Sequence, residues 1–132
     1  MKKPQFDEHG CDATTFAPFE LEDCLNTEWK DVRLAFCDWQ WFQDNYNSDT
    51  VDNYYMNGYG VEGLVKACRF SAGLEVEPDS IHYNSEGDTC YIHFTDLSDA
   101  VATANLSSTM INSIDNLTKG IQVAREHGFE DS

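Results

Sequence analysis

Hydrophobic and acidic residues alternate near the start of the chain, the spacing typical of strands whose two faces meet different surroundings. Phe19 and Leu21 alternate with glutamates, which predicts a short strand, and the preceding Pro18 favours an edge position for it. Further along, two spacings compete. Residues 31–37 alternate as a half-buried strand would, which is the structure we favour. A helix would instead place on one face Trp29, Val32, Phe36 and Trp39.

A helix is predicted after the turn signal Asn57-Gly58-Tyr59-Gly60, where an asparagine and two glycines tolerate positive φ. The positions that repeat at 0, 3, 4 and 7 are Val61, Leu64, Val65 and Cys68. Gly73 then stands just past the expected end of the helix. Before this turn, the Asn, Ser and Asp density of residues 45–53 predicts a surface loop.

A β-hairpin is predicted over residues 81–94, with Glu86-Gly87 as its two-residue loop. That register sets Tyr83 opposite Cys90 and Ile81 opposite Ile92. It gathers on one face Ile81, Tyr83, Cys90, Ile92 and Phe94, and on the other His82, Tyr91 and His93. The hairpin is the clearest structural signal in the chain, because turn and face pattern agree.

Two further helices are expected after the hairpin. The first begins near Asp96 and runs to about Leu106, where Ser107-Ser108 is expected to loosen the chain. The second carries Ile111, Ile114, Leu117 and Ile121, with Gly128 as its stop. The element order predicts an α+β fold: one antiparallel sheet with a central hairpin, packed by about three helices. Residues 1–15 are expected to form a flexible N-terminus, and residues 16–132 a single domain.

The charge balance restricts the possible partners. The chain has 8 Lys and Arg residues against 24 Asp and Glu residues, a net charge of −16. Such a charge repels phosphate backbones and anionic lipids, so direct nucleic-acid and membrane binding are disfavoured, whereas a basic protein surface is attracted. Solubility or adaptation to salt would produce the same composition.

Five cysteines are widely spaced and show no metal-ligand or disulfide-framework pattern. The N-terminus has no apolar segment typical of a signal peptide, so we expect reduced thiols and a cytoplasmic protein. Cys37, Cys68 and Cys90 fall on apolar faces and are interpreted as small core residues. His82 and His93 are interpreted as exposed strand residues, because two histidines are too few for a typical metal site.

The stretch from residue 38 to residue 60 combines aromatic rings with aspartates and contains no Lys or Arg. Large amphipathic rings anchor many protein interfaces, and carboxylates around them attract cationic partners. Most such rings serve as core, so the acidic setting is what favours a binding role. The predicted partner-binding residues, which include two from the hairpin tip, are Asp38, Trp39, Trp41, Asp44, Asp49, Asp52, Tyr54, Tyr55, Glu86 and Asp88.

The run at residues 55–64, with Asn57-Gly58-Tyr59 before a helix, is followed by the strand and acidic turn at residues 83–88 and by a further helix. Over residues 54–106 this pattern resembles the immunity protein 51 family, predicted immunity proteins of bacterial polymorphic toxin systems. The resemblance implies a small, acidic, cytoplasmic protein that protects a cell by binding a toxin. It implies no catalytic residues.

From the charge, the aromatic-acidic stretch and this resemblance, we expect an immunity protein that neutralises a cognate toxin, as in contact-dependent growth inhibition. The toxin is expected to be basic and of nuclease type, blocked at its active cleft, and the immunity protein to be no enzyme and to need no cofactor or metal. Two alternatives stay open. One is a phage-type acidic inhibitor that mimics nucleic acid and blocks a restriction or CRISPR enzyme; the other is a small enzyme with a carboxylate site.

Overall fold

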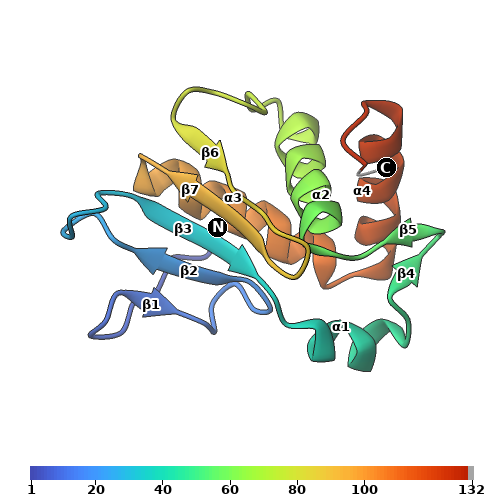
Figure 1. Ribbon diagram of the computed structural model, residues 1–132, viewed down its shortest axis with the longest axis horizontal. Helices are drawn as coiled ribbons and strands as arrows, with labels where there is room; N and C mark the ends of the chain where they lie inside the picture. The colour runs from blue at the N-terminus through green and yellow to red at the C-terminus, as the bar shows by residue number, and fades with distance from the viewer. Residues whose placement is uncertain (131–132) are drawn as a thin grey trace.

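A five-stranded antiparallel sheet forms the framework of the protein, whose computed structural model describes residues 1–130 (Figure 1). The strand order is β1-β2-β3-β7-β6. The bounds are β1 Cys11–Asp12, β2 Glu20–Asp23, β3 Val32–Phe36, β6 Ile81–Tyr83 and β7 Cys90–Phe94. A separate two-stranded sheet joins β4 Thr50–Val51 and β5 Tyr54–Tyr55. The helices are α1 Trp39–Tyr46, α2 Gly58–Ser71, α3 Leu97–Ile111 and α4 Ile114–Glu126.

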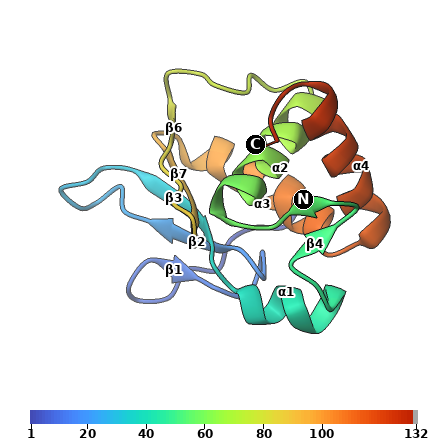
Figure 2. The ribbon, with the colours of Figure 1, turned by 45° about the vertical axis from the view of Figure 1, so that its right-hand side comes forward.

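Helices α2, α3 and α4 all lie on the same side of the five-stranded sheet (Figure 2). The alternation in β3 explains this layering, since Val32, Leu34 and Phe36 are buried against the helices while the intervening residues are half-buried on the other face. The same holds in β7, where Cys90, Ile92 and Phe94 are buried. The α+β fold and the strand expected at residues 31–37 are therefore confirmed.

The predicted hairpin forms, but its register is wrong by two residues. Tyr83 pairs with Ile92 and Ile81 with Phe94, and the bridge between Glu86 and Thr89 moves the loop to Gly87-Asp88. Because side chains alternate with a period of two, an even shift leaves every residue on its predicted face. The inward face therefore agrees with the prediction although the pairing does not.

The predicted end of α3 at Leu106 is also wrong. The helix continues to Ile111, and Ser107 and Ser108 are buried within it, because packing between the sheet and α4 outweighs the weak helix propensity of serine. The chain instead breaks at Ser113, whose side chain caps α4 by accepting from the backbone N–H of Asn116. No helix within residues 1–130 combines the length and apolar character needed to cross a membrane.

Helix α1 and the β4–β5 hairpin replace much of the surface loop expected before α2. The side chain of Asp38 caps α1, and Asn47 closes it in the left-handed conformation at φ 54°. The β4–β5 turn holds Asp52 and Asn53 at φ 54° and 63°, the two left-handed positions of a tight hairpin turn. With only eight residues and one fully buried side chain, Phe42, α1 offers little periodicity to detect.

The N-terminal segment contributes strand β1, which pairs with β2 and forms the sheet edge. The expectation that β2 is an edge strand is therefore wrong, and the sheet begins before residue 16. Asp12 is buried and accepts hydrogen bonds from the backbone N–H groups of Gln5, Thr14 and Thr15. The flexibility expected of residues 1–15 stays a prediction.

Candidate functional site

A hollow of about 250 Å³ opens where α1, the β4–β5 hairpin and the β6–β7 turn meet. It lies near the C-terminal end of β3, which leads into α1. In Figure 1 these three elements lie together beside the start of α2. We call it the acidic hollow; its lining residues are Trp39, Phe42, Gln43, Ser48, Asp49, Tyr55, Met56, Asn57, Gly87 and Asp88. Four of them belong to the predicted partner-binding set: Trp39, Asp49, Tyr55 and Asp88.

Helix α1 is fastened directly to the β6–β7 turn. The indole Nε1 of Trp39 donates to the backbone oxygen of Asp88 at 2.8 Å, and the Trp39 ring meets Phe36 edge-on with centroids 4.9 Å apart. One residue earlier, the Asp38 carboxylate accepts from the backbone N–H of Trp41 at 3.0 Å. Asp88, distant in sequence, is thereby held next to Trp39, whose chain neighbour is Asp38.

The start of α2 fastens the turn from the other side. The backbone N–H of Gly58 donates to the Gly87 oxygen at 3.0 Å. A Cβ atom on Gly58 would lie 1.7 Å from the backbone oxygen of Glu86, so only glycine permits this approach. Asn57 caps the helix by accepting from the Gly60 N–H at 2.7 Å. The Asn-Gly-Tyr-Gly run and the acidic turn, which together carry the family resemblance, are thus neighbours in space.

The β4–β5 hairpin supplies the third wall of the acidic hollow. The backbone N–H of Met56 donates to the Asp49 oxygen at 2.9 Å, which fixes the entry into β4 against the exit from β5. Tyr54 is fully buried beneath the hairpin, and its hydroxyl donates to the Gly60 oxygen. Tyr55 points the other way and is 57% exposed. Because successive side chains of a strand point to opposite faces, one of these adjacent tyrosines is buried and the other is exposed.

Within residues 1–130, the carboxylates near the acidic hollow form no ion pair; these are the carboxylates of Asp38, Asp44, Asp49, Glu86 and Asp88. The Cys37 thiol, just after β3, lies close enough to some of these carboxylates for them to affect its pKa. Partial desolvation raises the pKa of Cys37, and the nearby carboxylates of Glu20, Asp38 and Asp88 raise it further. Several carboxylates without an ion pair within residues 1–130 therefore lie around this hollow.

The structure disperses the rest of the predicted partner-binding set. Tyr54 is a core residue, so its prediction as a contact residue is wrong. Trp41 is half-buried and packs edge-on against Tyr46 with centroids 6.0 Å apart. Asp52 lies 3.7 Å from the guanidinium of Arg125 on α4. Asp44 is exposed on α1 and accepts from Gln40, outside the lining. Glu86 is exposed in the β6–β7 turn.

Sequence reasoning missed six lining residues: Phe42, Gln43, Ser48, Met56, Asn57 and Gly87. Asn57 and Gly87 stand out in the sequence as turn residues, but nothing there shows that the two turns touch. Phe42 and Gln43 lie on α1, which had no strong helical signal, whereas Ser48 and Met56 lie just outside β4 and β5, a hairpin that the sequence did not predict.

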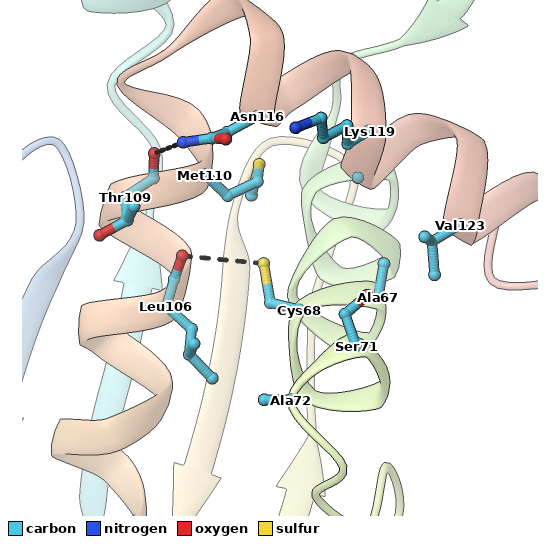
Figure 3. A pocket seen from close by; sticks show the side chains of 11 residues that line it. Ala67, Cys68, Ser71, Ala72, Leu106, Thr109, Met110, Asn116, Lys119 and Val123 are labelled. Atoms are coloured by element: carbon cyan, nitrogen blue, oxygen red, sulfur yellow. Dashed lines mark hydrogen bonds between the residues drawn. The ribbon is translucent and has the colours of Figure 1, made fainter.

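A second hollow, of about 350 Å³, lies between α2, α3 and α4 (Figure 3). Figure 3 shows Cys68 of α2 facing Leu106 of α3; the Cys68 sulfur lies 3.8 Å from the backbone oxygen of Leu106. Burial raises the pKa of Cys68 to about 12, so the thiol stays protonated at neutral pH. Lys119 is the one charged residue in its lining. This hollow has no carboxylate with which to attract a cation.

The remaining cysteines and histidines adopt several environments. Cys90 is buried as expected, whereas Cys37 is exposed, contrary to the core role expected for it, because it follows the last residue of β3. His93 is only partly exposed, and its Nδ1 lies 2.9 Å from an Asp31 oxygen. The ring of His82 lies 6.0 Å from that of His93. Residues 1–130 contain no group of three or more His, Cys, Asp or Glu side chains placed to hold a metal ion.

Comparison with models of known protein families, with curated protein sequences and with solved structures finds no match for this chain.

Proposed function

We propose that this protein is a cytoplasmic immunity protein that binds a basic, nuclease-type toxin and blocks its active cleft. The observation that carries the proposal is the acidic hollow, where exposed and half-buried rings from two elements meet carboxylates that form no ion pair within residues 1–130. Rings supply apolar contact area, and the charges supply attraction and orientation.

Carboxylates gathered around one hollow without a cation carry a cost, because like charges repel one another in the free protein. A cationic partner would relieve that repulsion on binding. Nucleases hold phosphate groups with Lys and Arg side chains, so their clefts offer the complementary charge. An acidic protein seated there excludes the nucleic acid without performing any chemistry.

The rigidity of the acidic hollow supports the same role. Backbone-directed hydrogen bonds from Trp39 to Asp88, from Gly58 to Gly87 and from Met56 to Asp49 hold its walls together before any partner arrives. A surface ordered in advance loses less conformational entropy on binding, which favours high affinity.

The proposal is tested with the toxin that we expect to be encoded directly upstream of this gene. The protein should bind that toxin and restore growth when the two are co-expressed. In stopped-flow measurements, Asp49→Lys and Asp44→Lys should each slow association about tenfold at low salt and change the unfolding free energy little. Salt should weaken the wild-type complex mainly through the association rate.

Glu28→Lys is the matched control, since it makes the same charge change in the exposed loop between β2 and β3. That loop lies at the opposite end of β3 from α1 (Figure 1). Its effect on association should be clearly smaller than that of Asp49→Lys. Absence of binding, or equal slowing by all three variants, would refute the proposed site.

A further inference from the structure

The size of the acidic hollow limits what it can hold. Sites for small-molecule ligands and cofactors typically enclose roughly 300–1,000 Å³. The acidic hollow measures about 250 Å³. A volume below this range suits one amino-acid side chain rather than a nucleotide or a drug-sized metabolite.

The lining of the acidic hollow identifies the chemistry of that side chain. Trp39, Phe42 and Tyr55 contribute rings, and Met56 contributes a polarisable thioether. Asp49 and Asp88 contribute carboxylates with no cation beside them in residues 1–130. Rings attract cations through their negative faces, and carboxylates attract them by charge and by accepting hydrogen bonds. An anionic group would be repelled, and a neutral polar group would gain hydrogen bonds to the carboxylates without the attraction between opposite charges.

Between the two basic side chains, arginine fits the lining better than lysine. Its planar guanidinium stacks on aromatic rings, is more weakly hydrated than an ammonium group, and presents several N–H donors in one plane. Donors in one plane could reach Asp49 and Asp88, which lie on different walls of the same hollow. Lysine would have to give up a strongly held hydration shell to enter.

From this geometry we infer that the acidic hollow receives a single arginine side chain of the basic partner, as the anchor of the complex. The inference rests on the proposed function, because it names the group by which the toxin would be held. Asp38 and Glu86, exposed next to lining residues, add to the negative field at the mouth of the hollow.

The test needs no toxin. N-acetyl-arginine amide is titrated into isotope-labelled protein at about 0.15 M salt, where the Debye length is about 8 Å and distant charges are screened. The readout is the NMR signal of the Trp39 indole N–H, which donates to Asp88. This signal should shift saturably, with a dissociation constant in the millimolar range expected of one side chain. The Trp29 indole, 63% exposed in the loop between β2 and β3, should not respond.

Matched probes and variants isolate the charge. N-acetyl-citrulline amide has the shape of the arginine probe without its charge and should bind at least about fivefold more weakly. Asp49→Asn and Asp88→Asn should each weaken arginine binding by about fivefold. Glu28→Gln removes the same charge from the exposed loop between β2 and β3 and should weaken it less than about twofold. No saturable shift at Trp39, equal binding of citrulline, or an equal effect of Glu28→Gln would overturn the inference.

Failure of this inference and failure of the proposed function give different results. If the arginine probe leaves Trp39 unaffected while the toxin still binds and is neutralised, the acidic hollow is not an arginine pocket but the immunity role stands. If the probe binds as expected and the toxin does not, the arginine pocket stands and the immunity role is refuted.

Discussion

The acidic hollow differs from a second group of residues, the Arg69 cluster of Arg69, Glu75, Asp99 and Thr103: both contain carboxylates, but within residues 1–130 only the Arg69 cluster pairs one with a cation. Arg69 of α2 has 3% of its side chain exposed and donates to Asp99 and Thr103 of α3 at 2.8 Å. It also donates twice to the backbone oxygen of Glu75. In the acidic hollow, Asp49 and Asp88 face solvent without a cation among residues 1–130.

The difference shows how a chain with so few basic residues uses them. Arg33, Lys66, Arg69 and Arg125 each form at least one ion pair within the fold. Negative charge at the acidic hollow is left for solvent or for a partner. Charge in the first region therefore supports the fold, whereas charge in the second should weaken it slightly and, under the proposed function, would attract the partner.

The largest effect is expected from Arg69→Met. Removing the guanidinium leaves the half-buried Asp99 and the backbone oxygen of Glu75 without their donor, which should lower the free energy of unfolding by about 3 kcal/mol. Urea denaturation measures it. Lys119→Met is the control, because Lys119 is exposed on α4 and forms no ion pair within residues 1–130; it should cost less than about 0.5 kcal/mol. A loss below about 1 kcal/mol for Arg69→Met would contradict the structural role of the cluster.

Gly58→Ala should have the next largest effect, and it should damage the acidic hollow. The added methyl would meet the Glu86 backbone oxygen, so the β6–β7 turn must move away from α2 at a cost of about 1–3 kcal/mol. Trp39 should lose its hydrogen bond to Asp88, visible as a shift of its indole N–H signal. A Cβ on Gly87 would meet no atom within 4 Å, so Gly87→Ala should leave both quantities nearly unchanged. Equal behaviour of the two variants would argue against the close approach.

Asp12 is a buried carboxylate whose charge is stabilised by hydrogen bonds and not by an ion pair within residues 1–130. Burial opposes its ionisation, but hydrogen bonds from Thr15, Gln5 and Thr14 prevail and lower its pKa from 3.8 to about 2. A pKa lowered in the folded state adds stability above the unfolded pKa, and that stability is lost as pH falls towards 2. Its size is roughly 2 kcal/mol.

Unfolding free energies of wild type and Asp12→Asn, measured between pH 5 and pH 2, test this expectation. The difference between the two proteins should be largest at pH 5 and should shrink as the pH falls through the interval from 3.8 to about 2. A difference independent of pH would mean that ionised Asp12 gains nothing from its neighbours.

The smallest effect should have the opposite sign. Replacing both Asp49 and Asp88 by Asn removes repulsion at the acidic hollow and should raise the free energy of unfolding by a few tenths of a kcal/mol at low salt. Screening should erase the gain near 1 M salt, where the Debye length is about 3 Å. Thermal unfolding at two salt concentrations measures it. Destabilisation by the double substitution would show that these carboxylates support the fold.

Much of the fold could be predicted because it depends on short-range patterns. Alternation assigned β3 and the faces of β6 and β7, and the spacing of Val61, Leu64 and Val65 assigned α2. The turn position in the hairpin was missed because Glu86-Gly87 and Gly87-Asp88 are similar turn sequences, and both registers place the same residues on the inward face. Helix α1 was missed because eight residues with one buried side chain carry little signal.

The candidate site was half predictable for a related reason. Composition drew attention to rings and aspartates after residue 38, and to the acidic hairpin tip. It could not separate Tyr54, which is buried, from Tyr55, which is exposed, because both are tyrosines at adjacent positions. Which of the two faces solvent depends on which face of β5 is turned inward, and the packing of the hairpin on α2 decides that orientation.

By itself, the sequence determined the net charge, the period of each long element and the faces of the central strands, because these follow from residue type and local spacing. Only the tertiary structure decided that Trp39, Asp49, Tyr55 and Asp88 share one hollow. Their meeting depends on Gly58, whose missing side chain lets the β6–β7 turn approach α2. Contacts between distant segments depend on such close packing, which a local pattern of hydrophobic and polar residues does not encode.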